Sequence, residues 1–304
     1  MIKLIIFCLL FSITTTQLLA NEHAEFEKSL LSIWVTTLKE YESTQNEYQF
    51  MQRRGTPIIF LNEENPKMSG LMALYEDETI YVNRTTLLDM VQELKRRGGA
   101  MDEEIPEVIA LKTVSFIGHE LVHGINSEKL EQAGVFYPGG LQEDEVVAYQ
   151  KQLEIFKEVE YYNSLLYLGI FGLELEFADD TYRDLKSSHR QGLSGMQNFV
   201  IGRGYGSGSI LDLDEFEERL NYNIEVITKS ISKVQNLIAK LEASDNVTTP
   251  ETQERLQLLY ETKSRFVAKL ELFKPQLTLI RDPIKSKILR EYYVARLLEQ
   301  GFDL

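Results

Sequence analysis

The sequence predicts an α+β protein in which a domain with a small antiparallel sheet and long helices precedes an all-α helical hairpin. Three observations predict this class. Two short segments near the N-terminus are rich in β-forming residues, apolar residues recur every three or four positions over long stretches, and residues 211–304 are rich in charge and poor in glycine. We expect three segments: residues 1–20, a first domain over 21–205, and a helical, coiled-coil-like domain over 206–304.

The first twenty residues have the pattern of a secretory signal peptide. Lys3 precedes an apolar run from Leu4 to Ile13, and small and polar residues follow as far as Ala20. A membrane-spanning helix needs about 20 apolar residues, so this run is too short to be an anchor. The only cysteine, Cys8, lies inside the segment. The mature chain is therefore expected to be exported, periplasmic or secreted, without thiols or disulfides.

The charge balance narrows the range of partners. The chain has 47 acidic and 32 basic side chains, a net charge of −15 at pH 7. This charge disfavours nucleic acid or an anionic membrane surface as a partner. The longest later apolar run, Leu165 to Leu173, ends before Glu174, so we expect no membrane span in the mature chain.

The N-terminal half alternates helical and strand patterns. Apolar spacing predicts a helix from Glu25 to about Gln49. Residues 21–50 could be a removable propeptide or the first helix of the domain, and the apolar face around Trp34 favours the helix. Two strands, expected to be antiparallel, follow at Thr56 to Leu61 and Leu74 to Asn83.

Two longer helices are predicted next. One covers Pro106 to Asn126 and carries apolar residues along one side, and a glycine-rich reversal from Gly134 to Gly140 follows it. The other covers Leu141 to Leu168. The stretch from Gly202 to Ser209 contains four glycines and is the expected domain boundary or mobile loop.

The C-terminal region reads as two helices joined by a break. Apolar residues from Leu220 to Leu241 predict the first helix, the segment from Asn246 to Pro250 interrupts it, and Leu256 to Leu272 continues the pattern. This hairpin could be a solvated support for the first domain, or it could mediate homo-oligomerisation or bind a partner.

The residues with the clearest chemical meaning are His119, Glu120 and His123. Histidines four residues apart lie on one face of a helix, where both can bind one Zn²⁺. Glu120 points elsewhere and can take a proton from metal-activated water as it attacks a carbonyl. The alternative is an exposed helix face that carries two histidines by chance.

The sequence His119-Glu120-Leu121-Val122-His123 and its apolar flanks resemble the zincin metallopeptidases. The metzincin branch would need Gly at 126 and His at 129, where Asn126 and Lys129 stand. The resemblance to gluzincins is better and implies a third ligand, a glutamate on a later helix. Glu143 and Glu145 open such a helix. We choose Glu145 because Ala148 and Tyr149 follow it in a Glu-x-x-Ala-Tyr arrangement, and Glu143 remains the competitor.

The same resemblance suggests further roles. Zincins place an antiparallel edge strand above the metal, and the segment Leu74 to Asn83 could be that strand, to which a peptide would add. It could equally be an ordinary solvent-facing hairpin. His189 or Tyr205 could stabilise an oxyanion, although a structural role is also open for each.

We therefore expect a zincin-like catalytic domain that binds one zinc ion per chain and hydrolyses peptides or proteins, with Glu120 as general base. The alternative is a zincin-derived scaffold without catalysis, which acts through its C-terminal helices. Neither the substrate nor the cleavage specificity follows from the sequence.

Overall fold

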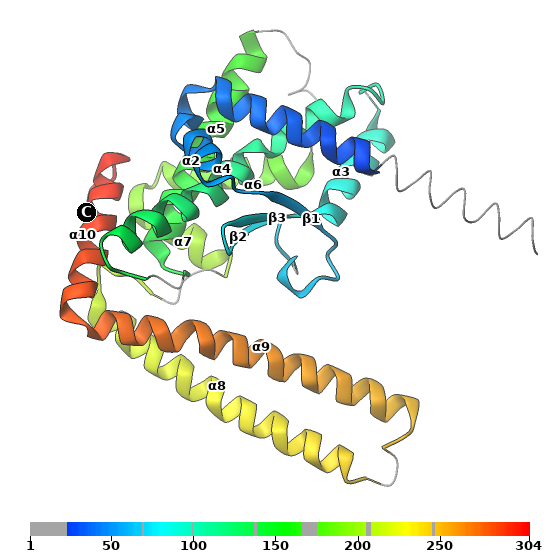
Figure 1. Ribbon diagram of the computed structural model, residues 1–304, viewed down its shortest axis with the longest axis vertical. Coiled ribbons are helices and arrows are strands. Elements are labelled where there is room, and N and C mark those ends of the chain that lie inside the picture. Colours follow the sequence, from blue (N-terminus) through cyan, green and yellow to red (C-terminus); the bar gives the residue numbers. More distant parts are fainter. Residues whose placement is uncertain are drawn as a thin grey trace, which may run out of the picture. The chain divides into compact units, whose positions relative to one another are not determined.

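The computed structural model describes residues 23–68, 70–98, 100–136, 139–165, 175–204, 208–244 and 247–304. The described chain is mostly helical and contains a three-stranded sheet, consistent with an α+β class (Figure 1). It divides into two compact units. Unit 1 contains residues up to Ile125 together with 148–187, and unit 2 contains 126–147 together with 188–304. The expected boundary after residue 205 lies inside unit 2.

A helix over residues 23–40 comes first. The elements that follow are η1 (Glu42–Thr44), α2 (Gln45–Arg54), β1 (Ile58–Leu61), η2 (Pro66–Met68), β2 (Ala73–Glu76), β3 (Thr79–Asn83), α3 (Arg84–Arg97), α4 (Ile105–Gln132), α5 (Gln142–Leu165), α6 (Glu176–His189), α7 (Gly192–Gly202), α8 (Leu213–Glu242), α9 (Pro250–Arg281) and α10 (Pro283–Glu299). The division between the units runs through α4 and α5, and each of these helices is continuous across it.

The sheet is mixed, which corrects the expectation of an antiparallel sheet. Its strand order is β1-β3-β2. The segment Leu74 to Asn83 is a hairpin whose turn residues Asp77 and Glu78 have φ values of 50° and 59°, as the tight turns of hairpins require. β2 and β3 are therefore antiparallel. β1 pairs with the other side of β3 and runs parallel to it. The segment between β1 and β2, which contains η2, carries the chain across to the far edge of the sheet, and the β2–β3 hairpin then brings β3 back beside β1.

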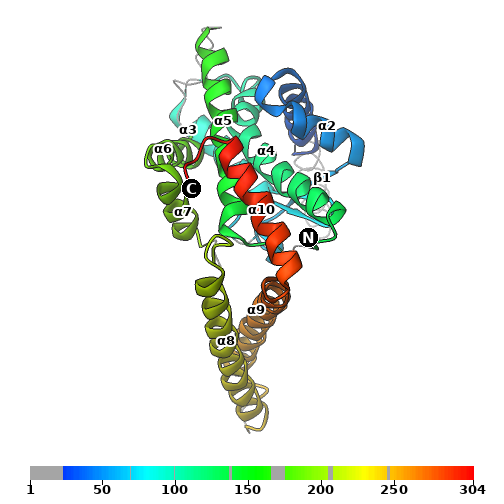
Figure 2. The same ribbon diagram turned by 90° about the vertical axis from the view of Figure 1, so that its left-hand side faces the viewer.

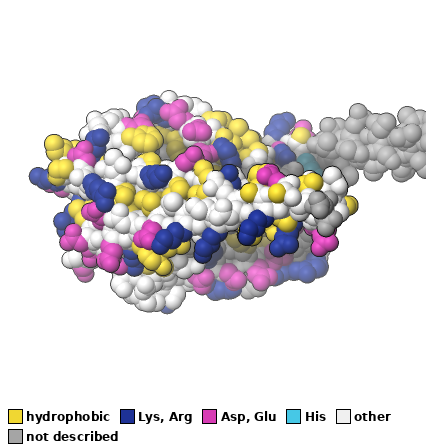
Figure 3. Space-filling view, turned by 90° about the horizontal axis from the view of Figure 1, so that it is seen from below, with side chains coloured by type: hydrophobic (Ala, Val, Ile, Leu, Met, Phe, Trp, Pro, Cys, Tyr) yellow, Lys and Arg dark blue, Asp and Glu magenta, His cyan; other side chains and the backbone are white. Residues whose placement is uncertain are grey.

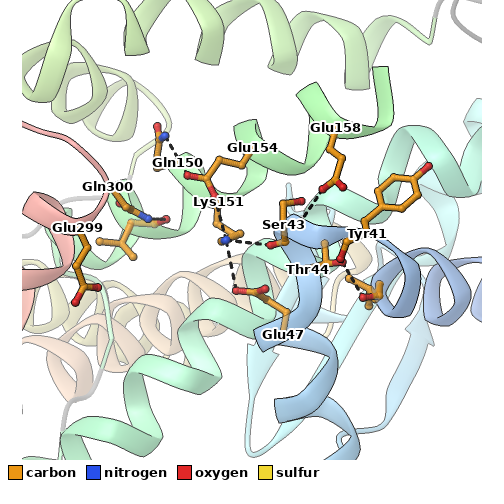
Figure 4. A network of polar contacts seen from close by, with 12 residues as sticks. Tyr41, Ser43, Thr44, Glu47, Gln150, Lys151, Glu154, Glu158, Glu299 and Gln300 are labelled. Atoms are coloured by element: carbon orange, nitrogen blue, oxygen red, sulfur yellow. Dashed lines mark hydrogen bonds and ion pairs between the residues drawn. The ribbon is translucent and has the colours of Figure 1, made fainter. Parts of the chain in front are cut away.

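The single helix expected over Glu25 to Gln49 is broken near Tyr41. The break has a tertiary cause in the polar contacts of Figure 4. Both carboxylate oxygens of Glu158, on α5, accept hydrogen bonds at 2.9 Å from the backbone N–H groups of Glu42 and Ser43. Lys151 donates to the carbonyl of Ser43 at 3.0 Å. Side chains on α5 thus bind the start of a second helix, and such partners cannot be read from local spacing.

Unit 1 is organised around α4. The indole N–H of Trp34 lies 3.1 Å from both the carbonyl of Ala110 and the hydroxyl of Thr113, and its ring stacks on Phe60 of β1. The first helix is therefore part of the core of this unit. By length and composition alone, α4 could cross a membrane, but 89% of its most apolar window is buried inside the protein. Burial inside the protein accounts for its composition.

In unit 2, α8 and α9 form a long antiparallel hairpin (Figures 1 and 2). Val234, Ile238 and Leu256 form the buried cluster between them. Both helices are longer than the ranges predicted from the sequence, since α8 ends at Glu242 and α9 ends at Arg281. Local apolar spacing does not predict α3, α6, α7 or α10 as separate helices, because their apolar patterns are short or interrupted by polar residues.

Some expected features lie outside the described residues: the signal peptide with Cys8, residues 166–168 of the predicted second long helix, the apolar run from 166 to 173, and residues 205–207 of the glycine-rich stretch, which include Tyr205.

Candidate metal centre

Helix α4 carries the two histidines and Glu120 of the motif. The Nε2 atoms of His119 and His123 lie 3.1 Å apart. His119 and Glu120 are buried, with 6% and 8% of their surfaces exposed, and His123 is partly exposed. The helix around them is buried on nearly all sides, which places these polar side chains in an apolar setting. The described motif helix runs past the predicted end at Asn126 to Gln132.

Glu145, in the first turn of α5, completes a three-residue cluster. One potential ligand atom from each of His119, His123 and Glu145 lies within 4.8 Å of the others. Two nitrogen ligands on one tetrahedral Zn²⁺, each about 2.0–2.1 Å from the metal, lie about 3.3 Å apart. The observed histidine separation matches this value, and the His/His/carboxylate donor set is one that zinc accepts. The buried cluster could hold a metal ion.

Tyr149, one turn after Glu145 on α5, packs against the cluster. Its ring meets the His119 ring edge to face, with centroids 4.4 Å apart. The preceding residue, Ala148, is fully buried. The aromatic edge restricts the orientation of the imidazole. From the sequence, Tyr149 was named only as part of the Glu-x-x-Ala-Tyr arrangement. Its spacing of four residues from Glu145 was the available signal for this contact.

Strand β2 contacts the glutamate of the motif. The backbone N–H of Tyr75 donates a hydrogen bond of 2.7 Å to Oε2 of Glu120. β2 is an edge strand in the described sheet, so this N–H points away from β3. A glycine permits the approach, because a Cβ at Gly124 would lie 2.7 Å from ring atoms of both Phe50 and Tyr75. The sequence did not reveal this hydrogen bond, since it joins positions 45 residues apart.

Glu143, the competing third ligand, is occupied elsewhere. Its carboxylate accepts a hydrogen bond from the hydroxyl of Ser209 and another of 3.0 Å from the backbone N–H of Ile210. The side chain is fully buried, and this burial raises its pKa above the ordinary carboxyl value. Glu143 therefore anchors the segment before α8 to the start of α5.

Within unit 2, a polar network begins in the C-terminal part of α4. The amide of Asn126, three residues after His123, donates to Asp144 at 2.7 Å, and the hydroxyl of Tyr292 on α10 donates to Oδ1 of Asn126 at 2.6 Å. Burial raises the pKa of Tyr292, so its hydroxyl is protonated and able to donate. The network joins α4, α5 and α10. No local pattern marks Tyr292, which lies 166 residues from Asn126.

Of the two residues considered for oxyanion stabilisation, only His189 lies within the described residues. The ring of His189 contacts Phe302 in unit 2, with centroids 6.1 Å apart. Tyr205 lies outside the described residues. No family model, curated protein or solved structure matches this chain.

Proposed function

We propose that the chain is an exported zinc-dependent peptidase in which His119, His123 and Glu145 hold one zinc ion and Glu120 is the general base. The observation that carries this proposal is the buried cluster of three ligand atoms within 4.8 Å of one another, with Glu120 next to the first histidine. A site that only stabilised the fold would need a fourth protein ligand and would have no use for a neighbouring base.

The residues divide the chemistry between them. Bound zinc would supply Lewis acidity to water and to the scissile carbonyl. Glu120 accepts the proton released as water attacks and returns it to the leaving amine, and the Tyr75 N–H holds one of its carboxylate oxygens in place. Tyr149 keeps the His119 ring from turning away from its ligand position.

A peptide substrate is proposed to pair with the outer edge of β2. That edge already uses the N–H of Tyr75 to bind Glu120. A peptide carbonyl can pair at this position only by exchanging with the carboxylate. The substrate would thereby release one oxygen of the base when it binds.

Metal analysis and one substitution test the proposal. The protein purified from residue 21 onward should contain about one zinc per chain and cleave an unstructured protein such as casein. Glu120→Gln should retain the metal and the fold, because the Gln carbonyl can still accept from Tyr75, and activity should fall by about 10²–10⁴-fold. A chain that stays metal-free after zinc reconstitution would contradict the proposal.

The scaffold alternative makes the opposite prediction for Glu120→Gln. If the chain is a scaffold, the zinc-loaded variant keeps the cellular phenotype of the natural chain, because the function then depends on a partner that binds the α8–α9 hairpin. Under the peptidase reading the phenotype disappears although the far-ultraviolet circular dichroism and zinc content are unchanged.

A further inference from the structure

Between Tyr222 and Lys240, one exposed stripe of α8 combines basic and apolar side chains and contains no acidic residue. Before it, the same arc carries Glu215 and Arg219, which pair with each other. Going along the helix at 100° per residue, six side chains fall within about 80° of arc: Tyr222, Val226, Lys229, Lys233, Leu237 and Lys240. All six are exposed, and the three apolar ones have 66%, 41% and 46% of their surfaces in solvent. Lys229 pairs with Glu225, which lies just outside the stripe.

Helix α9 carries a matching stripe. Between Arg255 and Lys269 its exposed members, all within about 80° of arc, are Arg255, Leu258, Arg265 and Lys269. The exposed Glu251, one turn before Arg255, falls on the same arc. Leu258 is 61% exposed. The only acidic residue between Arg255 and Lys269 is Glu261, which lies beside the stripe. The net charge of the chain is −15, whereas these two stripes carry positive charge.

The two stripes lie on the same side of the hairpin. Viewed from the N-terminus of its own helix, each stripe is turned counter-clockwise by roughly 100–120° from the face that contacts the other helix. That contact face contains Val234 and Ile238 on α8 and Leu256 on α9. Because the helices are antiparallel, the same rotation places both stripes on one side. Figure 3, the view from below, shows several Lys and Arg side chains close to hydrophobic ones.

The charged and apolar side chains on this side of the hairpin indicate which kind of partner it can bind. Six Lys and Arg side chains on one side exclude a second copy that binds through the same face, because like charges would oppose each other. Exposed Tyr, Leu and Val between the cations suit a boundary where long basic side chains reach headgroups and apolar ones enter the acyl region. The net negative charge does not prevent this, since charges beyond about 8–10 Å are screened at physiological salt.

We propose that this side of the α8–α9 hairpin, formed by the two stripes, binds the surface of a bilayer that contains anionic lipids. The stripe on α8 extends about 27 Å along the helix, long enough to contact several headgroups. The hairpin lies on the bilayer and does not cross it. This inference concerns unit 2 and does not depend on the metal centre or on peptidase activity.

Vesicle co-sedimentation tests the proposal. The probe is phosphatidylcholine vesicles with or without phosphatidylglycerol, and the protein starts at residue 21, which keeps every described residue and removes the apolar run of residues 4–13. We expect binding to the anionic vesicles at about 0.1 M salt and its loss at about 1 M, where the Debye length falls from about 10 Å to about 3 Å. Neutral vesicles should bind weakly at both salt concentrations.

Matched triple substitutions make the test specific to the stripe. Lys229→Gln, Lys233→Gln and Lys240→Gln together should lower affinity for anionic vesicles by about 100-fold, because each Lys near such a surface contributes about fivefold. The control replaces three exposed lysines elsewhere, Lys28, Lys285 and Lys287, with Gln and should retain binding. Both triple variants keep helix-forming residues, so circular dichroism should be unchanged.

Three results would overturn the proposal: no binding of the unaltered protein to anionic vesicles, equal binding to neutral ones, or a stripe variant that binds like the control. Binding of an acidic protein without any binding to vesicles would likewise reject the bilayer in favour of a protein partner.

Discussion

The backbone N–H of Tyr75 and Oε2 of Glu120 are 2.7 Å apart, so an edge strand binds the glutamate of the helix motif directly. The close approach depends on Gly124, one turn after Glu120, because a larger residue would meet the rings of Phe50 and Tyr75. The position of β2 relative to α4 is thus set by the absence of a side chain.

Gly124→Ala should separate the strand from the helix. The added Cβ would lie 2.7 Å from two aromatic rings, and such overpacking typically costs about 1–3 kcal/mol. We expect a lower free energy of unfolding in urea and a loss of activity greater than the loss of folded protein. Gly202→Ala is the control, since a Cβ at that helical glycine would meet nothing within 4 Å. If both variants lose activity equally, the spacing between β2 and α4 is not what matters.

Glu145→Ala should lower zinc affinity, whereas Glu143→Ala should lower the stability of the fold. Removing Glu145 takes away a ligand atom of the cluster, and zinc affinity should fall by roughly 100-fold or more. Removing Glu143 deprives Ser209 and Ile210 of their acceptor and should cost about 1–3 kcal/mol of stability. Competition with a fluorescent zinc chelator measures the first effect and urea denaturation the second. Loss of zinc from the Glu143 variant with the Glu145 variant unaffected would exchange their roles.

Tyr292→Phe tests whether α10 positions the ligand helices. The variant removes only the hydroxyl that donates to Asn126, so stability should fall by about 1 kcal/mol. If the network orients α4 and α5, zinc affinity should also fall, by roughly 10-fold. Tyr260→Phe, which removes an exposed hydroxyl bound to Glu242 on the hairpin, should change neither quantity. A stability loss with zinc affinity unchanged would limit Tyr292 to a structural role.

The alkaline limit of stability should depend on Tyr41. Burial, together with the nearby Glu158 carboxylate, raises the pKa of Tyr41 from 10.0 to about 12. The folded state therefore holds the phenolic proton more tightly than the unfolded state. The stability contributed by this difference is complete below pH 10 and is lost as the pH rises from about 10 to about 12. In Tyr41→Phe, the free energy of unfolding should fall less steeply over that interval. Parallel curves for both proteins would contradict this prediction.

Local sequence patterns were enough to predict the long helices and the segments that form strands. The apolar spacing around Val114 to Ile125 predicts a helix because α4 is buried at each turn. On α8 the spacing marks the one side that carries the buried Leu220, Ile227 and Val234. The break at Tyr41 and the parallel pairing of β1 with β3 escaped such reasoning. The first depends on Glu158 and Lys151 from a distant helix, and the second on the path of a connecting loop.

For the site, the sequence by itself determined that His119 and His123 share a helix face and that Glu120 does not, because the period of an α-helix is fixed by its backbone hydrogen bonds. The resemblance of the motif to the zincins led us to expect a third ligand, a carboxylate, at the start of the next helix. Only the tertiary structure decided which carboxylate lies near the histidines. Glu143 and Glu145 point in different directions around α5, and the approach of α4 brings the ligand atom of Glu145 within 4.8 Å of the imidazoles while Glu143 binds Ser209 and Ile210. Helix periodicity is local, whereas the contact between two helices depends on all the side chains that pack between them.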